Sequence, residues 1–152
     1  MIREIVQVGD AVLRQKCEPV VKFDKDLCTL LDDMRDTLKK AEGAGLAAPQ
    51  VGVTVRAVLV DVEEGFFELI NPVFVWQKGE QYGYEGCLSV RGKAGKVLRP
   101  DKVKIVYSDR RGNRLSLVAR GFFARAVCHE LDHLDGVLYT DKADDVRYED
   151  ED

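Results

Sequence analysis

The amino-acid sequence predicts an α+β fold, on three observations. Apolar residues recur at helical spacing in two segments, one near each end of the 152-residue chain. The segments between them are rich in valine, isoleucine and phenylalanine, which favour β-strands. An order of helix, strands and helix is typical of α+β proteins, and this length suits one domain over residues 1–152.

The first helix is expected to begin after Asp24, whose carboxylate can cap it, and to end before Gly43. Its apolar stripe consists of Leu27, Leu30, Leu31, Met34 and Leu38. A second helix is expected over residues 120–134, with Gly136 near its C-terminal end because glycine is common just past the last helical residue.

Strands are expected at residues 53–62, 66–75, 102–108 and 114–118. Pro72 has no backbone N–H to donate, so it indicates an edge strand or a bulge. Residues 109–113, Asp-Arg-Arg-Gly-Asn, predict a hairpin turn between the last two strands. The acidic end of the chain, residues 144–152, indicates a solvated, frayed or disordered tail.

Composition narrows the functional classes. A net charge of −4 and a pI near 5.3 argue against a protein that is held on nucleic acid by phosphate contacts. No apolar run reaches membrane-spanning length, and the start of the chain lacks the pattern of a signal peptide. We therefore expect a cytoplasmic protein without a membrane partner, whose four cysteines are free thiols or metal ligands rather than disulfides.

Residues 129–133 read His-Glu-Leu-Asp-His, and these are the only two histidines in the chain. On a helix, His129 and His133 lie on one face, so both imidazoles can bind one metal ion. Glu130 points to the side, where its carboxylate can handle the protons of a reacting water. The alternative is a charged helix face that matches this short motif by chance.

A catalytic metal requires a third protein ligand, which must be a cysteine or a carboxylate in this chain. The HExxH proteases fit poorly, because Tyr139 stands where one class has its third histidine and only a short acidic end follows. A small HExxH metallopeptidase is nevertheless one alternative. A structural Cys/His zinc site is another, although the sequence offers no evident fourth ligand for it.

Cys87 is the best third ligand among the four cysteines. It lies within residues 82–89, Tyr-Gly-Tyr-Glu-Gly-Cys-Leu-Ser, where glycines allow a close approach of the backbone. Cys128 is turned off the face that the histidines share, and we interpret it as a small buried thiol. Cys17 and Cys28 are interpreted as structural. A Cys87 thiolate would complete a set of one sulfur and two nitrogens.

Residues 43–50, Gly-Ala-Gly-Leu-Ala-Ala-Pro-Gln, form a third distinctive stretch. Glycines at alternate positions suit a loop whose backbone comes close to a ligand. Gln50 follows a proline that restricts it, and its amide can donate to a developing oxyanion. The alternative is a simple helix stop followed by a turn.

Together, residues 43–50, 85–89 and 129–133 resemble the peptide deformylases, whose motifs read GxGLAxPQ, EGCxS and HExDH. The resemblance covers nearly the whole chain, including residues 9–14. It implies a small metallohydrolase with antiparallel or mixed sheets packed around a central metal-binding HExxH helix. It also implies the reaction, which releases formate from N-formylmethionyl peptides at the start of new bacterial or organellar chains.

The resemblance implies a role for each motif. The metal ligands would be Cys87, His129 and His133. Glu130 would transfer protons, while the amide of Gln50 and the backbone N–H of Leu88 would stabilise the oxyanion. The family similarity implies Fe²⁺, which Zn²⁺ or Ni²⁺ can replace, whereas spacing and ligand type alone favour zinc. The substrate methionine is expected in an apolar pocket lined by Gly43, Ala44, Gly45, Phe122 and Ala126.

The chain also departs from the family pattern. Ala94 stands where a substrate-holding arginine is expected, and Arg91 and Lys93 are neighbouring cations that could replace it. Cys128 stands where the family usually has glutamine. The family's longer C-terminal helix, implicated in docking to the ribosome, is not evident in the acidic end. These departures raise the alternative of a deformylase-like protein with altered substrate choice.

Overall fold

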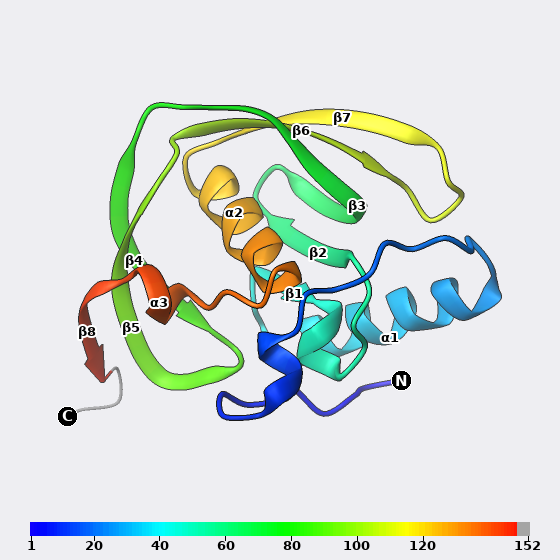
Figure 1. The fold of residues 1–152 in the computed structure, drawn as a ribbon, viewed down its shortest axis with the longest axis horizontal. Coiled ribbons are helices and arrows are strands. Elements are labelled where there is room, and N and C mark those ends of the chain that lie inside the picture. Colours follow the sequence, from blue (N-terminus) through cyan, green and yellow to red (C-terminus); the bar gives the residue numbers. More distant parts are fainter. Residues whose placement is uncertain (149–152) are drawn as a thin grey trace.

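The computed structural model describes residues 1–148, which form two antiparallel sheets around one long buried helix (Figure 1). The first sheet has the order β1-β2-β3-β6-β7, with β1 at Gly45–Ala47, β2 at Ala57–Val62, β3 at Gly65–Lys78, β6 at Lys102–Ser108 and β7 at Arg114–Arg120. The second has the order β4-β5-β8, with β4 at Gln81–Cys87, β5 at Val90–Arg99 and β8 at Asp144–Tyr148.

Two α-helices follow the predicted pattern. The first, α1, spans Lys25–Ala41, and the carboxylate of Asp24 accepts a hydrogen bond from the N–H of Leu27 at its start. It ends at Glu42, which adopts the left-handed conformation with φ of 56°, so the predicted stop before Gly43 is confirmed. The remaining helical segments are α2 at Phe122–Leu134, the single turn α3 at Tyr139–Lys142, and the 3₁₀ turns η1 at Ala11–Arg14 and η2 at Ala48–Val51.

Helix α2 lies in the centre of the molecule between the two sheets (Figure 1). All of its residues except Phe122 and Asp132 are buried. Val127 and Leu131 belong to the same hydrophobic cluster as Val58 and Ile105 of the five-stranded sheet. A helix that is buried on every side keeps its polar side chains away from water, which determines the chemistry of the residues at 129–133.

The predicted strands are confirmed with shifted ends. Strand β6 has the predicted bounds, while β7 continues to Arg120, because this residue pairs with Lys102; helix α2 therefore begins at Phe122 rather than at 120. Strand β2 begins at Ala57 rather than at 53. Pro72 lies in a register shift between the pairs formed by Ile70 and Val73, so the bulge is confirmed.

The hairpin of β4 and β5 was not predicted, because its glycines and charged residues give a weak strand pattern. Residues 144–148 are exposed, as predicted for a solvated tail, but they are not disordered, because they form β8 on the edge of β5. Two side-chain bonds hold this strand: the hydroxyl of Tyr82 donates to Asp144, and that of Tyr84 donates to Asp145. The rest of the predicted tail, 149–152, lies outside the described residues.

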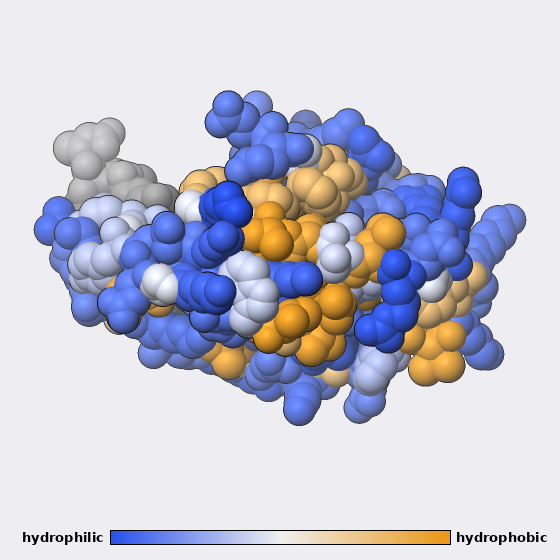
Figure 2. Space-filling view, turned by 90° about the horizontal axis from the view of Figure 1, so that it is seen from above, coloured by the Kyte–Doolittle hydropathy of each residue, from blue (hydrophilic) through white to orange (hydrophobic). Residues whose placement is uncertain are grey.

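The outer surface is mixed rather than uniformly polar. On one face, hydrophobic patches lie among hydrophilic side chains (Figure 2). The apolar residues that the first sheet leaves exposed are Val73, Val75, Leu115 and Val118. Among the described residues, no helix is long and apolar enough to cross a membrane.

Candidate metal centre

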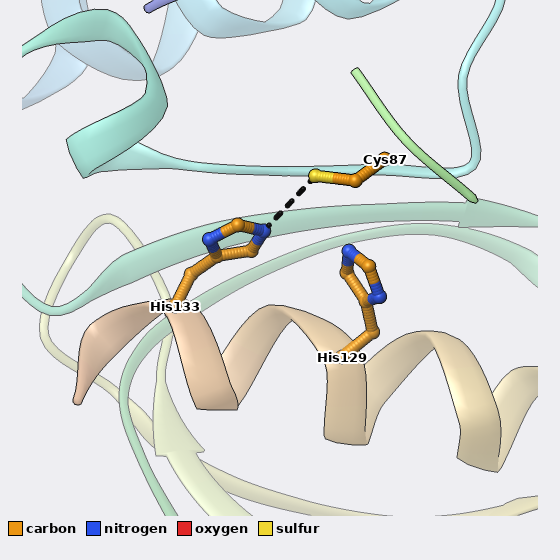
Figure 3. Close-up of side chains that lie close together, drawn as sticks. All are labelled: Cys87, His129 and His133. Atoms are coloured by element: carbon orange, nitrogen blue, oxygen red, sulfur yellow. Dashed lines mark hydrogen bonds between the residues drawn. The ribbon is translucent and has the colours of Figure 1, made fainter. Parts of the chain in front are cut away.

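Helix α2 presents His129 and His133 on one face, as their spacing predicts, with ring centroids 5.1 Å apart. Both imidazoles are buried. The helix ends at Leu134, directly after His133. Two residues later, Gly136 takes a φ of +74°, which a glycine adopts without strain. The two rings point away from the helix axis toward the end of β4 (Figure 3).

Cys87 is the last residue of β4 and lies opposite the two histidines (Figure 3). A register shift between Glu85 and Cys87 interrupts the pairing with β5, and Cys87 then pairs with Val90 across a tight turn. Its Sγ lies 3.4 Å from Nε2 of His133. The ligand atoms of Cys87, His129 and His133 all lie within 4.8 Å of one another.

This donor set fits a divalent transition metal. Ligand bonds of about 2.3 Å to sulfur and 2.0–2.1 Å to nitrogen, at tetrahedral angles, place the two ligand atoms roughly 3.6 Å apart. The 3.4 Å between Cys87 Sγ and His133 Nε2 is close to that value. One thiolate and two imidazoles leave a coordination position open, as in catalytic rather than structural sites.

Glu85 determines how the ring of His129 is oriented. Its Oε1 lies 2.8 Å from Nδ1 of His129, which leaves Nε2 of the same ring facing the metal position. Arg99 donates two hydrogen bonds of 2.8 Å to Glu85, and Arg125 donates a third of 2.8 Å. Burial alone would raise the pKa of Glu85, but the bonds from Arg99 and His129 lower it to about 2, so the group is a carboxylate.

Glu130 lies beside the ligands and is nearly unsolvated. Its Oε2 is 4.0 Å from Nε2 of His129, and its Oε1 is buried without a hydrogen-bond partner among the described residues. Burial raises the pKa of Glu130 to about 7, against the opposing effect of His129. The backbone of Gly45 in β1 packs tightly against Glu130, since a Cβ at Gly45 would lie 2.5 Å from Oε2 of Glu130.

Gln50 is fixed by its own turn, η2. Its Oε1 accepts a 2.9 Å hydrogen bond from the N–H of Ala47, so the amide nitrogen points the other way. That nitrogen donates to Oγ of Ser89 at 3.0 Å and lies 3.5 Å from Sγ of Cys87. The amide nitrogen therefore lies beside the sulfur of the candidate ligand Cys87.

A pocket of about 410 Å³ opens onto these groups. All five residues predicted for the substrate pocket line it, namely Gly43, Ala44, Gly45, Phe122 and Ala126, and so do Gln50, Leu88, Glu130, Cys87 and His129. Arg91 is exposed and lines this pocket, whereas Ala94 and Lys93 do not, and Arg91 has no ion pair within residues 1–148. Arg125 also lines the pocket but is paired with Glu85, so Arg91 is the lining cation that is left for a ligand.

The sequence prediction missed the residues that support the ligands. Glu85 and Ser89 belong to the motif at residues 85–89, but the sequence pattern assigned them no role, and it did not indicate Arg99 or Arg125. A usable signal existed, because a metal-binding histidine generally donates its other ring N–H to a carboxylate or carbonyl. Glu85 is the only glutamate within residues 82–89, so it is the natural candidate for this carboxylate.

The interpretation of the other cysteines is confirmed for two of them. All four cysteines are free, as expected. Cys17 and Cys128 are buried, and burial raises the pKa of each thiol to about 11. Cys28 is half-buried beside the apolar face of α1.

Comparisons with known proteins agree with this geometry. The family model of polypeptide deformylase matches residues 2–149. The chain is 52% identical over 141 residues to a peptide deformylase of Caldanaerobacter subterraneus, covering 93% of this chain and 89% of that protein. It is 49% identical to peptide deformylase 1 of Bacillus cereus, covering 99% and 96%.

Solved structures give the same result. The crystal structure of a peptide deformylase from Legionella pneumophila superposes with a TM-score of 0.92 at 38% identity, covering 95% of this chain and 88% of that one. A deformylase from Synechococcus elongatus in complex with actinonin gives a TM-score of 0.91 at 38% identity, covering 94% and 79%. The predicted fold class is therefore confirmed.

Proposed function

Because the chain belongs to the peptide deformylase family, hydrolases that remove the formyl group from N-formylmethionyl peptides, we propose that Cys87, His129 and His133 hold its catalytic metal. The convergence of these three ligand atoms is the observation that carries the proposal. Fe²⁺ is the proposed ion on family resemblance, and the same donors accept Zn²⁺ or Ni²⁺.

When bound, the metal supplies a Lewis acid that polarises a carbonyl oxygen and lowers the pKa of a water. Glu130 is the proposed proton carrier. With a pKa near 7 and an oxygen that has no hydrogen-bond partner within residues 1–148, it can take a proton from the attacking water and return it to the methionine amine. Water and the formyl amide are thereby converted into formate and a free amino terminus.

Gln50 and Leu88 are the proposed oxyanion donors. As water attacks, the formyl oxygen gains negative charge, and N–H donors that are already in place stabilise it. The Gln50 amide is held in place by Ala47 and Ser89, so it does not have to reorganise during the reaction. Leu88 lines the pocket beside Cys87, and its backbone N–H is the second donor.

The substrate peptide is proposed to enter at Phe122, with its methionine side chain on the apolar part of the pocket formed by residues 43–45 and Ala126. Arg91 takes the role that the family resemblance gave to position 94, because Arg91 lines the pocket and Ala94 does not. Nascent chains are the proposed partners, and a cytoplasmic location follows from that substrate. Docking to the ribosome stays a prediction, since β8 rather than a long helix follows α3 in the described part.

The test of the catalytic assignment is Glu130→Gln, which removes the proton carrier and keeps the side-chain shape. We expect full metal content and a kcat for formate release that is roughly 10²–10⁴-fold lower. Asp135→Asn is the matched control, a neutralised carboxylate at the end of the same helix, paired with Arg56 away from the pocket. Near-normal turnover in Glu130→Gln would show that another group carries the proton.

A further inference from the structure

The segment before η1 makes direct contact with both proposed oxyanion donors. The N–H of Val6 donates to the carbonyl of Gln50 at 2.8 Å. Two residues later, the N–H of Val8 donates to the carbonyl of Ser89, also at 2.8 Å. Between them, the side-chain amide of Gln7 donates to the carbonyl of Leu88 at 3.0 Å. Residues 6–8 therefore join two parts of the site that lie far apart in the sequence.

These two parts belong to different sheets. Gln50 lies in η2, directly after β1 of the five-stranded sheet, whereas Leu88 lies in the turn between β4 and β5 of the three-stranded sheet. An oxyanion site needs donors that are held in place before the reaction, because a donor that must move loses much of its effect. The relative position of η2 and the β4–β5 turn therefore matters for catalysis.

The bonding of Gln7 suits a positioning role. Its Nε2 carries two hydrogens, and these go to two carbonyls: Leu88 at 3.0 Å and Ile5 at 3.3 Å. The first bond reaches across 81 positions of sequence, and the second returns to the segment's own backbone. The Leu88 carbonyl is thus bonded to a side chain that is itself held by its own segment.

We infer that Gln7 is a positioning residue of the deformylase reaction: its amide fixes the backbone of Leu88, and with it the N–H that is proposed as an oxyanion donor. The inference rests on the proposed function, which makes Leu88 an oxyanion donor. Gln7 does not line the pocket, so it acts only through Leu88. Its loss should weaken transition-state stabilisation and leave substrate binding unchanged.

The variant that tests this is Gln7→Met, which keeps an unbranched side chain of similar length and removes both N–H donors. We expect kcat for a formyl-Met peptide to fall about tenfold, less than the 10²–10³-fold typical of losing an oxyanion donor outright, with KM within about twofold. Gln7→His keeps one N–H donor and should recover part of the lost kcat.

Gln81→Met is the matched control. The Gln81 amide also donates to two backbone carbonyls, those of Pro100 and Gly121, but neither of these residues lines the pocket. Its oxygen accepts only the longest of the hydrogen bonds of Arg125, at 3.3 Å, and Arg125 keeps its 2.8 Å bond to Glu85. It should lose similar thermal stability and keep its kcat. An unchanged kcat in Gln7→Met, a rise in KM alone, or an equal loss in Gln81→Met would overturn the inference. Should Gln7→Met not fold, Gln7→His decides: a reduced kcat at constant KM supports the inference, and a normal kcat overturns it.

Gln50→Leu separates this inference from the proposed function. If Gln50→Leu keeps its kcat, the oxyanion assignment itself fails. If Gln50→Leu loses kcat while Gln7→Met does not, only the role of Gln7 fails.

Discussion

Glu85→Gln should weaken metal binding and fold stability together. The carboxylate is buried, lies 2.8 Å from Nδ1 of His129, and accepts three hydrogen bonds from Arg99 and Arg125. Glutamine keeps one carbonyl oxygen, but it replaces the other oxygen with an NH₂ group that faces a guanidinium. The variant therefore leaves two buried cations without their shared anion and loosens the orientation of a metal ligand.

The expected losses of fold stability and of metal affinity can be worked out separately. Removing one partner of a buried ion pair costs about 3–5 kcal/mol when the remaining charge is left unpaired. This applies to Arg125, whereas Arg99 keeps its ion pair with Asp132. At about 2–4 °C per kcal/mol for a chain of this length, the melting temperature should fall by roughly 6–20 °C. Loss of the partner of a ligating histidine typically lowers metal affinity by about 10–100-fold.

The assay is a competitive metal titration together with thermal unfolding of the metal-loaded protein. Glu68→Gln is the control, since it breaks a partly buried ion pair with Arg110 away from the metal ligands. Arg110 keeps Asp32 as a second partner, so this control should lose less stability than Glu85→Gln and no metal affinity. Wild-type metal affinity in Glu85→Gln, or an equal loss in Glu68→Gln, would refute the reasoning.

Three further predictions concern the pocket and the buried thiols. Gly45→Ala should lower kcat by about 10²-fold at full metal content, because its Cβ would lie 2.5 Å from Oε2 of Glu130 and displace that group; an unchanged kcat in steady-state kinetics would contradict this. Formyl-Met peptides should have a higher kcat/KM than formyl-Asp peptides, because residues 43–45 and Ala126 form an apolar pocket, and equal values would count against that pocket. Cys17 should resist iodoacetamide at pH 8 in the folded protein, since burial keeps its thiol protonated up to a pKa of about 11. Labelling measured by mass spectrometry should rise as the pH approaches that value, and rapid labelling at pH 8 would argue against burial.

The sequence was most informative where chemistry and periodicity coincide. The spacing of His129 and His133 on a helix, together with the glycines around Cys87, predicted three candidate ligands, and the fold brings these residues together. The end of α1 and the bulge at Pro72 followed from the backbone properties of single residues. Such features are local, so a sequence pattern is enough to indicate them.

The features that could not be predicted depend on long-range pairing. Strand β8 is exposed along its whole length and has an acidic sequence, and it exists because β5 offers an open edge and two tyrosines offer hydroxyls. The network around Glu85 joins β4, β5 and α2, so no single stretch of sequence contains it. The contact between Gln7 and Leu88 is of the same kind.

X-ray absorption at the metal edge tests the central claim most directly. For the protein loaded with one equivalent of zinc or, without oxygen, iron, the account predicts one sulfur scatterer and two imidazole nitrogens, with zinc–sulfur and zinc–nitrogen distances of about 2.3 Å and 2.0–2.1 Å. Cys87→Ser should lose the sulfur contribution, whereas Cys28→Ser should keep it. A first shell without sulfur, or a sulfur contribution that survives in Cys87→Ser, would contradict the assignment of Cys87, His129 and His133 as the metal site.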